Sequence, residues 1–217
     1  CKNNNILFHT DAVQLIGKKE INLNNLNVDF VSIGAHKFYG PKGIGALYLK
    51  KGIKLNPIFN GGGQENGYRP GTESISLIAG MTLALKIATK NLYENLQCIK
   101  KLEDLFLDLL DKNSINYTLN GKNRAPGFMN ITFYECDGQT MLMNLDMKGI
   151  AISYGSACTS GSAKPSNALL QIGMDEVNAK KTVRISIGKL ITEKNIIILS
   201  ESINDIIMQN KKVVNYV

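Results

Sequence analysis

The sequence has no tryptophan, and only two histidines and three arginines occur among its 217 residues. Its four cysteines, Cys1, Cys98, Cys136 and Cys158, form no CxxC pair and have no regular spacing. A tetrahedral zinc site needs clustered cysteines and histidines, so we expect no metal site. Unpaired thiols in a chain of this size indicate a reducing compartment, and we expect a cytoplasmic protein.

Long hydrophobic runs are also missing. No apolar stretch approaches the roughly 20 residues that span a bilayer, so we expect no membrane partner. The start, CKNNNILFHT, has neither the apolar core of a signal peptide nor the arginines of a transit peptide. It also lacks an initiator methionine and begins inside a predicted strand, so we expect the chain to be part of something longer.

Positive charge is in excess but is not concentrated. The net charge is +7, and the lysines are scattered in pairs such as Lys18-Lys19 and Lys180-Lys181. Nucleic-acid-binding proteins usually carry a basic stripe on one face, so we expect no nucleic-acid partner.

Alternating strands and helices predict an α/β chain. Leu92, Leu96, Ile99, Leu102 and Leu105 begin a wide apolar stripe on a long helix. We place a domain boundary beside this helix, giving domains 1–92 and 93–217. The predicted strands are 6–9, 29–36, 44–50, 115–119, 128–134, 150–154 and 183–187, with the third antiparallel to the second, and the predicted helices begin near Thr72-Glu73, 91, Asp137 and Thr192.

Within this scheme, Cys98 beside the stripe is predicted to be a packed thiol, and Cys136 is predicted to be structural. The final helix is predicted to turn a set of isoleucines inward: Ile196, Ile197, Ile203, Ile206 and Ile207.

Lys37 ends a predicted buried strand in SIGAHKFYGPKG and stands beside His36. A lysine before a turn most often reaches for water. A partly desolvated lysine can instead attack a carbonyl carbon and form a Schiff base. Asp11, in HTDAVQ, follows another predicted buried strand. Pyridoxal phosphate (PLP) enzymes need such a carboxylate to keep the pyridine nitrogen protonated, and Gln14 could hydrogen-bond the phenolic oxygen.

Two further residues carry possible chemistry. Cys158 lies in a loop of small and polar residues, SYGSACTSGSAKPS, where it is either a mobile nucleophile or an incidental thiol. Arg184, in TVRISIG, is either a clamp for a substrate carboxylate or a partner in a surface salt bridge.

Taken together, these residues resemble the cysteine desulfurases, the NifS-like branch of the class V aminotransferase family, which has the fold type I of PLP enzymes. The motifs that carry the resemblance are HTDAVQ, GAHKFYGPKGIGALY, GGGQENGYRPGTES, SYGSACTSGSAKPS and VRISIG, in the family's order. The resemblance implies that L-cysteine is converted to L-alanine, with the sulfur held as a persulfide and passed to an acceptor protein, for example in iron–sulfur cluster assembly.

The resemblance also implies roles for individual residues. Lys37 is similar to the lysine that forms the Schiff base with PLP, and Cys158 to the persulfide-forming nucleophile. Arg184 resembles the arginine that holds the substrate carboxylate. The implied cofactor contacts are Asp11 at the pyridine nitrogen, Gln14 near the phenolic oxygen, His36 at the phosphate, and Thr72 at the phosphate of the other subunit, which implies a homodimer.

The chain departs from the family pattern in two ways. Gly34 stands where a phosphate-contacting serine is common, three residues before the lysine. The resemblance covers only the C-terminal half or somewhat more of a family member. It implies an incomplete large-domain sheet in 1–92 and a small α/β C-terminal domain in 93–217, with an open apolar sheet edge.

Two alternatives remain at this point. A selenocysteine lyase belongs to the same chemical class. A half-length protein that binds a partner and performs no chemistry belongs to another class, and it would not need Asp11, Lys37, Cys158 and Arg184 together.

Overall fold

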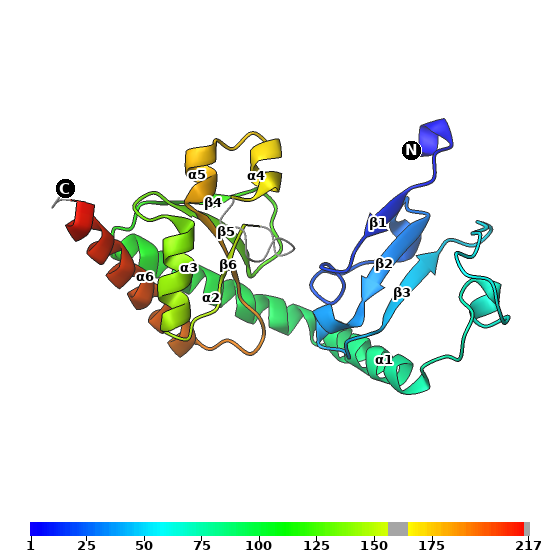
Figure 1. Cartoon of the computed structure of the whole chain (residues 1–217). Helices are drawn as coiled ribbons and strands as arrows, with labels where there is room; N and C mark the ends of the chain where they lie inside the picture. The colour runs from blue at the N-terminus through cyan, green and yellow to red at the C-terminus, as the bar shows by residue number, and fades with distance from the viewer. Residues whose placement is uncertain (156–164, 215–217) are drawn as a thin grey trace. The chain divides into compact units, whose positions relative to one another are not determined.

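The computed structural model of the chain describes residues 1–155 and 165–214, and it divides into two compact units, Cys1–Glu94 and Asn95–Val217. The predicted boundary after residue 92 lies two residues before this division. Both units combine helices with a sheet (Figure 1).

The first unit contains a three-stranded sheet in the order β1-β2-β3 (Figure 1). β1 (His9–Asp11) runs parallel to β2 (Phe30–Gly34), and β3 (Gly45–Leu49) runs antiparallel to β2, which confirms the predicted direction of the third strand. Four short 3₁₀ helices accompany the sheet: η1 (Lys2–Asn4), η2 (Leu23–Asn25), η3 (Ala35–Phe38) and η4 (Glu65–Gly67).

A small core holds this unit together. Val31 of β2 packs with Ala35 and Phe38 of η3 and with Ala88 of the helix α1 (Ile75–Lys90). Alternation along β2 turns Val31 toward this core, as period-two patterning requires.

The predicted strand 6–9 is mostly wrong. Regular pairing starts only at His9, and Ile6, Leu7 and Phe8 are exposed, the first two by more than half of their surface. Among the described residues, β1 pairs only with β2 and has no strand on its other side, so the apolar run before it is not buried.

The predicted start of α1 is also shifted. Ser74, and not Thr72, occupies the N-cap position, and its side chain makes no capping hydrogen bond. Along this helix, Ile75 and Leu83 are 71% and 60% exposed. The face that packs on the core is made instead by Met81, Ala84, Leu85 and Ala88.

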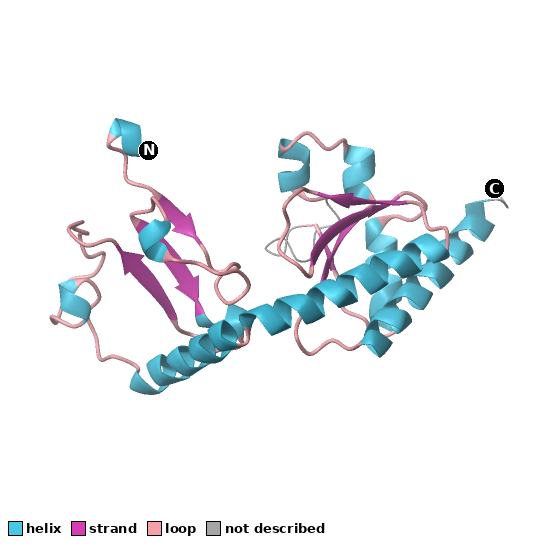
Figure 2. Cartoon of the chain, turned by 180° about the vertical axis from the view of Figure 1, so that it is seen from behind, coloured by secondary structure: helices cyan, strands magenta, loops and turns pink. Residues whose placement is uncertain are grey.

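The second unit has a four-stranded sheet in the order β4-β5-β7-β6, with antiparallel pairing throughout. Its helices α2 (Leu92–Lys112) and α6 (Glu193–Val214) run side by side in Figure 2, and their buried residues share one core with the sheet. The strands are β4 (Tyr117–Asn120), β5 (Phe128–Phe133), β6 (Ser153–Tyr154) and β7 (Thr182–Ser186), and the other helices are α3 (Gly138–Met147), α4 (Asn167–Gln171) and α5 (Glu176–Lys180).

The long helices follow the predicted patterns closely, with two corrections. Cys98 is exposed and not packed, because it lies on the outer side of α2. Ile197 is 42% exposed, whereas Ile196 and Ile203 are almost fully buried. Positions 196 and 197 are about 100° apart around a helix, so one core cannot cover both completely. The short helices α4 and α5 were not predicted.

Among the helices of the described residues, none by itself is long and apolar enough to cross a membrane, and only α1 and α2 taken together pass that test by length and composition.

Candidate functional site

The parallel pairing of β1 and β2 brings Asp11, His36 and Lys37 to one edge of the first sheet. Asp11 is the last residue of β1 and lies opposite Ser32 of β2. β2 ends two residues later at Gly34, and η3 follows with His36 and Lys37. Because the two strands are parallel, their carboxyl ends open to the same side, where ligands of α/β sheets usually bind.

Local hydrogen bonds hold the Asp11 carboxylate in place. The Val13 amide donates to Asp11 Oδ1 at 2.9 Å, and the Ala12 amide donates to the Ser32 carbonyl at 3.0 Å. Ala12 itself is buried. The carboxylate is therefore fixed to the strand end and stays exposed.

Lys37 projects from a tight turn and not from the strand itself. Its neighbours Ala35 and Phe38 are buried, Lys37 is half-buried, and His36 is exposed. The Gly40 amide donates to the Ala35 carbonyl at 2.9 Å and closes the turn. A Cβ at Gly40 would lie 2.9 Å from that carbonyl oxygen, so the turn requires glycine there.

Lys18 joins this group, and sequence reasoning did not single it out. Its ammonium donates to Gln14 Oε1 at 3.4 Å. Burial lowers the pKa of Lys18, and the positive charge of Lys37 lowers it further. In the sequence, this contact is indicated only by the spacing of four residues between Gln14 and Lys18, which places the two side chains on one face of a helical turn.

Gly34 and Ser32 bear on the expected phosphate contacts. A Cβ at Gly34 would lie 3.1 Å from Val13 Cγ1, so a serine there would crowd Val13. The Ser32 hydroxyl lies 2.8 Å from His9 Nε2 in a hydrogen bond. The side chain of Thr72 is exposed, in the segment between η4 and α1.

Arg184 belongs to the second unit. It lies on β7 between buried Val183 and Ile185, so its side chain points to the opposite face of the sheet and is exposed. Its Nη2 donates to Ser153 Oγ on β6 at 3.1 Å. This contact joins residues 31 apart in sequence, and no sequence signal indicated it.

Cys158 lies outside the described residues, between β6 and α4. Of the described cysteines, Cys136 is 2% exposed, and burial raises the pKa of its thiol to about 11, with a smaller effect from Asp137. A protonated, buried thiol is a poor nucleophile, which agrees with a structural role for Cys136.

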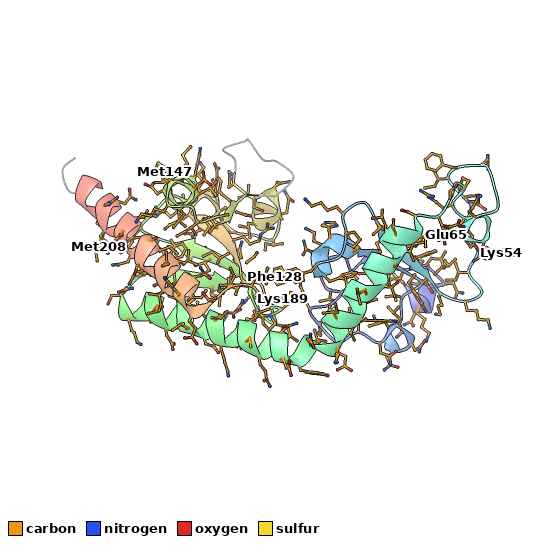
Figure 3. All side chains as sticks on the ribbon, turned by 90° about the horizontal axis from the view of Figure 1, so that it is seen from below. Lys54, Glu65, Phe128, Met147, Lys189 and Met208 are labelled. Atoms are coloured by element: carbon orange, nitrogen blue, oxygen red, sulfur yellow. The ribbon has the colours of Figure 1, made fainter. Side chains whose placement is uncertain are left out.

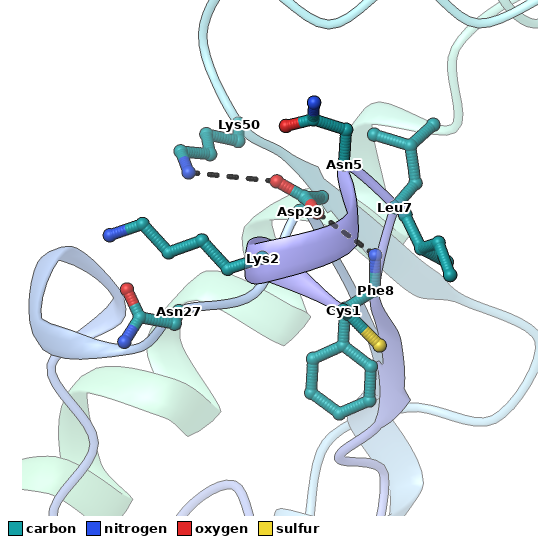
Figure 4. Close-up of a pocket in the computed structure, with 9 residues that line it drawn as sticks. Cys1, Lys2, Asn5, Leu7, Phe8, Asn27, Asp29 and Lys50 are labelled. Carbon is teal, nitrogen blue, oxygen red and sulfur yellow. Dashed lines mark hydrogen bonds and ion pairs between the residues drawn. The ribbon is translucent and has the colours of Figure 1, made fainter.

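Two pockets in the described residues offer alternative sites. One of about 240 Å³ surrounds the amino end of β1, where Asp29 accepts a hydrogen bond from the Phe8 amide at 2.9 Å and pairs with Lys50 at 3.5 Å (Figure 4). The other, in the second unit, lies beside Glu135, Lys181 and Lys211. Neither pocket is lined by a residue predicted to be functional.

Within 1–155 and 165–214, no group of three or more histidine, cysteine, aspartate or glutamate side chains could hold a metal ion.

The donor set at the β1–β2 edge fits pyridoxal phosphate. A fixed carboxylate suits a protonated pyridine nitrogen, a half-buried lysine suits an aldehyde, and the Gln14 amide suits a phenolic oxygen. These groups lie at or shortly after the carboxyl ends of two neighbouring strands, so one aromatic ring between them could contact all three.

Comparison with known proteins gives consistent results. A model of the aminotransferase class-V family matches residues 1–199. A protein named cysteine desulfurase IscS from Clostridium botulinum (strain Hall) is 41% identical over 216 residues, which cover 98% of this chain and 54% of that protein. A protein named cysteine desulfurase, mitochondrial, from Saccharomyces cerevisiae is 40% identical, over 94% of this chain and 41% of that protein.

Solved structures agree with the sequence relatives. A structure described as a NifS-like protein has a TM-score of 0.84 and 32% identity, covering 95% of this chain and 54% of the other. One described as SspA in complex with cysteine has a TM-score of 0.70 and 33% identity, covering 87% and 52%. The chain thus spans about half the length of the relatives it matches.

Proposed function

Because the chain belongs to the aminotransferase class-V family, we propose that it forms the Lys37- and Cys158-bearing part of a PLP-dependent cysteine desulfurase. The observation that carries the proposal is the placement of Asp11 at the carboxyl end of β1 and of Lys37 in η3, just after the carboxyl end of the parallel strand β2. A binding module without chemistry would have no need of this arrangement.

In this proposal, the residues of the β1–β2 edge hold the cofactor. Lys37 binds the aldehyde carbon, Asp11 pairs with the pyridine nitrogen, and Gln14 donates to the phenolic oxygen. His36 contacts the phosphate, and Thr72 contacts the phosphate bound by a second subunit, so the working enzyme is a homodimer. The bound cofactor supplies an electron sink for the carbanion formed at the substrate.

The remaining residues act on L-cysteine. Arg184 binds the substrate carboxylate, and the Lys37 amine takes the proton from Cα. Cys158 Sγ attacks the substrate sulfur, and the C–S bond breaks with its electron pair left on the substrate Cβ. Cβ takes a proton, Cα regains one from the Lys37 amine, and L-alanine leaves. The sulfur stays on Cys158 as a persulfide and passes to an acceptor protein in the cytoplasm, such as an iron–sulfur scaffold.

A visible-absorbance titration of the 217-residue chain with PLP tests the cofactor site. We expect a band of lysine-bound cofactor that borohydride fixes on Lys37. The Lys37→Ala variant should lack this band, and Lys42→Ala, which changes an exposed lysine five residues away, should keep it. An equally strong band in Lys37→Ala would refute the assignment of Lys37.

Turnover tests the nucleophile. A protein that produces alanine and sulfide from L-cysteine should lose this activity in Cys158→Ala while the cofactor band persists. Undiminished sulfide release in this variant would remove Cys158 from the mechanism. Comparing L-cysteine with L-selenocysteine as substrates separates the desulfurase from a selenocysteine lyase.

A partner-binding role remains the second candidate, because the first unit exposes many large apolar side chains, including Ile58 at 89% and Phe59 at 70%. Such surfaces usually mark protein contacts. This role predicts stable association with a second polypeptide and no cofactor on Lys37.

A further inference from the structure

The sheet of the second unit has two chemically different faces. One face is apolar and packs on α2, α3 and α6 through Met129, Ile131 and Val183. The opposite face is polar because alternate residues point away from that core. Its residues include Thr118, Asn120, Asn130, Thr132, Ser153, Thr182 and Arg184.

Strand register aligns four of these residues in a row across the sheet. Asn120 lies opposite Asn130, Asn130 lies opposite Arg184, and Arg184 lies opposite Ser153. Directly paired residues on one face have Cβ atoms about 5 Å apart, so their side chains are in reach of one another. Arg184 is thus flanked by a polar side chain from each neighbouring strand.

Hydrogen bonds join the residues of this row in two pairs. Asn120 Nδ2 donates to Asn130 Oδ1 at 2.9 Å, and Arg184 Nη2 donates to Ser153 Oγ at 3.1 Å. Asn120 Nδ2 also donates to Thr132 Oγ1 at 2.9 Å, and the hydroxyl oxygens of Thr132 and Thr182 are hydrogen-bonded at 2.7 Å. Asn120, Asn130, Thr132 and Thr182 thus form one hydrogen-bonded group on this face, and Arg184 and Ser153 form a second one beside it.

The contact with Ser153 limits how the guanidinium can turn. A free arginine side chain samples many rotamers, and its planar fork binds a carboxylate well only when it is oriented. The Ser153 hydroxyl engages one N–H of Nη2 and leaves the other four N–H groups for other acceptors.

We propose that Ser153 is a positioning residue that orients the Arg184 guanidinium for a substrate carboxylate. This inference rests on the proposed function, in which Arg184 binds the carboxylate of L-cysteine. Ser153 does not touch the substrate; it acts through Arg184 by fixing the plane of the fork before the substrate arrives.

The first test needs no cofactor and uses NMR of the arginine side chains in the 217-residue chain. We expect resolved Nη signals for Arg184, because a held guanidinium rotates slowly. Ser153→Ala should average these signals, and Ser153→Thr, which keeps the hydroxyl, should restore them. Ser186→Ala, which removes a hydroxyl two residues from Arg184 on the same strand, should leave them unchanged. Arg184 signals that are identical in Ser153→Ala and the unmodified chain would overturn the proposal.

The second test measures the rate at which the PLP-loaded enzyme that contains this chain releases sulfide from L-cysteine, at increasing L-cysteine concentrations. We expect Ser153→Ala to raise the half-saturating L-cysteine concentration about 3- to 10-fold, the effect of one ordinary hydrogen bond, with the maximal rate within about twofold. Ser153→Thr should recover most of the loss. A half-saturation that is unchanged in Ser153→Ala would overturn the positioning role and leave the proposed function standing.

The second test can also refute the proposed function. If the longer enzyme that contains this chain, loaded with PLP, releases no sulfide from L-cysteine, the proposed function fails and the positioning role fails with it.

Discussion

Burial separates the described cysteine side chains into two chemical classes. Cys136 lies in the core of the second unit, and the pKa of its thiol is raised to about 11. Cys98 lies on the exposed side of α2. The sequence predicted a packed thiol for Cys98 and a structural role for Cys136, and the structure shows that only Cys136 is buried.

Thiol reactivity should follow this division. At pH 8 only about 0.1% of a thiol with a pKa of about 11 is ionised, so Cys136 should react slowly with a disulfide reagent such as DTNB. Cys98→Ala should remove one rapidly reacting thiol, whereas Cys136→Ala should leave the rapid phase intact. The pKa of the Cys136 thiol is about 11 in the folded chain and about 9 in an unfolded one. The protonated thiol therefore adds to the free energy of unfolding below about pH 9, and this contribution is lost as the pH rises toward 11. Rapid labelling of Cys136 in the folded chain would contradict this picture.

The buried carboxylate of Glu103 forms an ion pair with the partly buried Arg124. Glu103, 2% exposed, accepts from Arg124 Nη2 at 3.0 Å and from the Gly127 amide at 2.8 Å. Arg124 also donates to the Phe128 carbonyl at 2.9 Å, so this network anchors the start of β5. Phe128, in the same strand, is labelled in Figure 3.

Glu103→Gln should lower the free energy of unfolding by about 2 kcal/mol, because it weakens charge-assisted bonds to groups that stay buried. Urea denaturation monitored by circular dichroism measures the loss. The matched control is Asp104→Asn, which breaks an exposed pair with Lys100 and should cost less than about 0.5 kcal/mol. Equal losses in the two variants would contradict the prediction.

At the level of elements, η3 determines where Lys37 lies. The turn needs a close contact between Gly40 and the Ala35 carbonyl. The sequence showed a glycine-rich turn after the lysine, and the structure adds that the lysine lies inside a 3₁₀ turn between two buried residues.

Gly40→Ala should therefore reduce the amount of PLP that borohydride fixes on Lys37, although it changes no cofactor-binding residue. The added Cβ would lie 2.9 Å from the Ala35 oxygen, so η3 must shift. Gly63→Ala, where a Cβ would meet nothing within 4 Å, should behave like the unmodified chain. Quantitative mass spectrometry of the reduced Lys37 peptide measures both variants, and equal labelling in the two would contradict the argument.

The helix α6 provides a further prediction at this level. Thr192 Oγ1 accepts from the Asn195 amide at 3.3 Å, and the Thr192 amide donates to Asn195 Oδ1 at 2.9 Å, so the two residues cap the helix reciprocally. Thr192→Ala should cost about 1 kcal/mol of stability in urea denaturation, and Thr192→Ser should cost much less. A loss as large in Thr192→Ser would exclude the cap as the cause.

At the level of the whole molecule, the two units differ in how completely their apolar side chains are buried. The second unit has a large shared core, whereas the first buries few residues and exposes Ile75, Leu83 and Phe59. On the surface of the second unit, Met147 and Met208 are also exposed (Figure 3). The unequal cover suits a chain that spans about half the length of its relatives.

We therefore expect the purified chain to associate through the exposed face of α1. Leu83→Glu should lower the average mass in sedimentation analysis without changing the circular dichroism spectrum, because a charge in a buried apolar contact is costly. Leu190→Glu, at a position 77% exposed in the second unit, is the control and should leave the mass unchanged. An average mass equal to that of one chain, 23.8 kDa, at all concentrations of the unmodified protein would contradict this expectation.

Much of the fold could be predicted from local pattern. Most helices and strands lie within a few residues of the predicted positions, because helical and strand periods are local properties of side-chain order. The errors arise where a partner decides burial: Ile6 and Leu7 look like a buried strand, Ile197 like a core residue, and Cys98 like a packed thiol. Nothing in the neighbouring sequence shows what covers each of them.

The sequence by itself determined the family resemblance and the candidate residues Asp11, Lys37 and Arg184, because chemistry at a site requires particular side chains in particular local settings. Tertiary structure alone decided which of them have neighbours that orient them. Strand pairing sets Asp11 against Ser32, 21 positions away, and Arg184 against Ser153, 31 positions away. Such contacts depend on register between strands that are distant in sequence, and register is a property of the folded sheet.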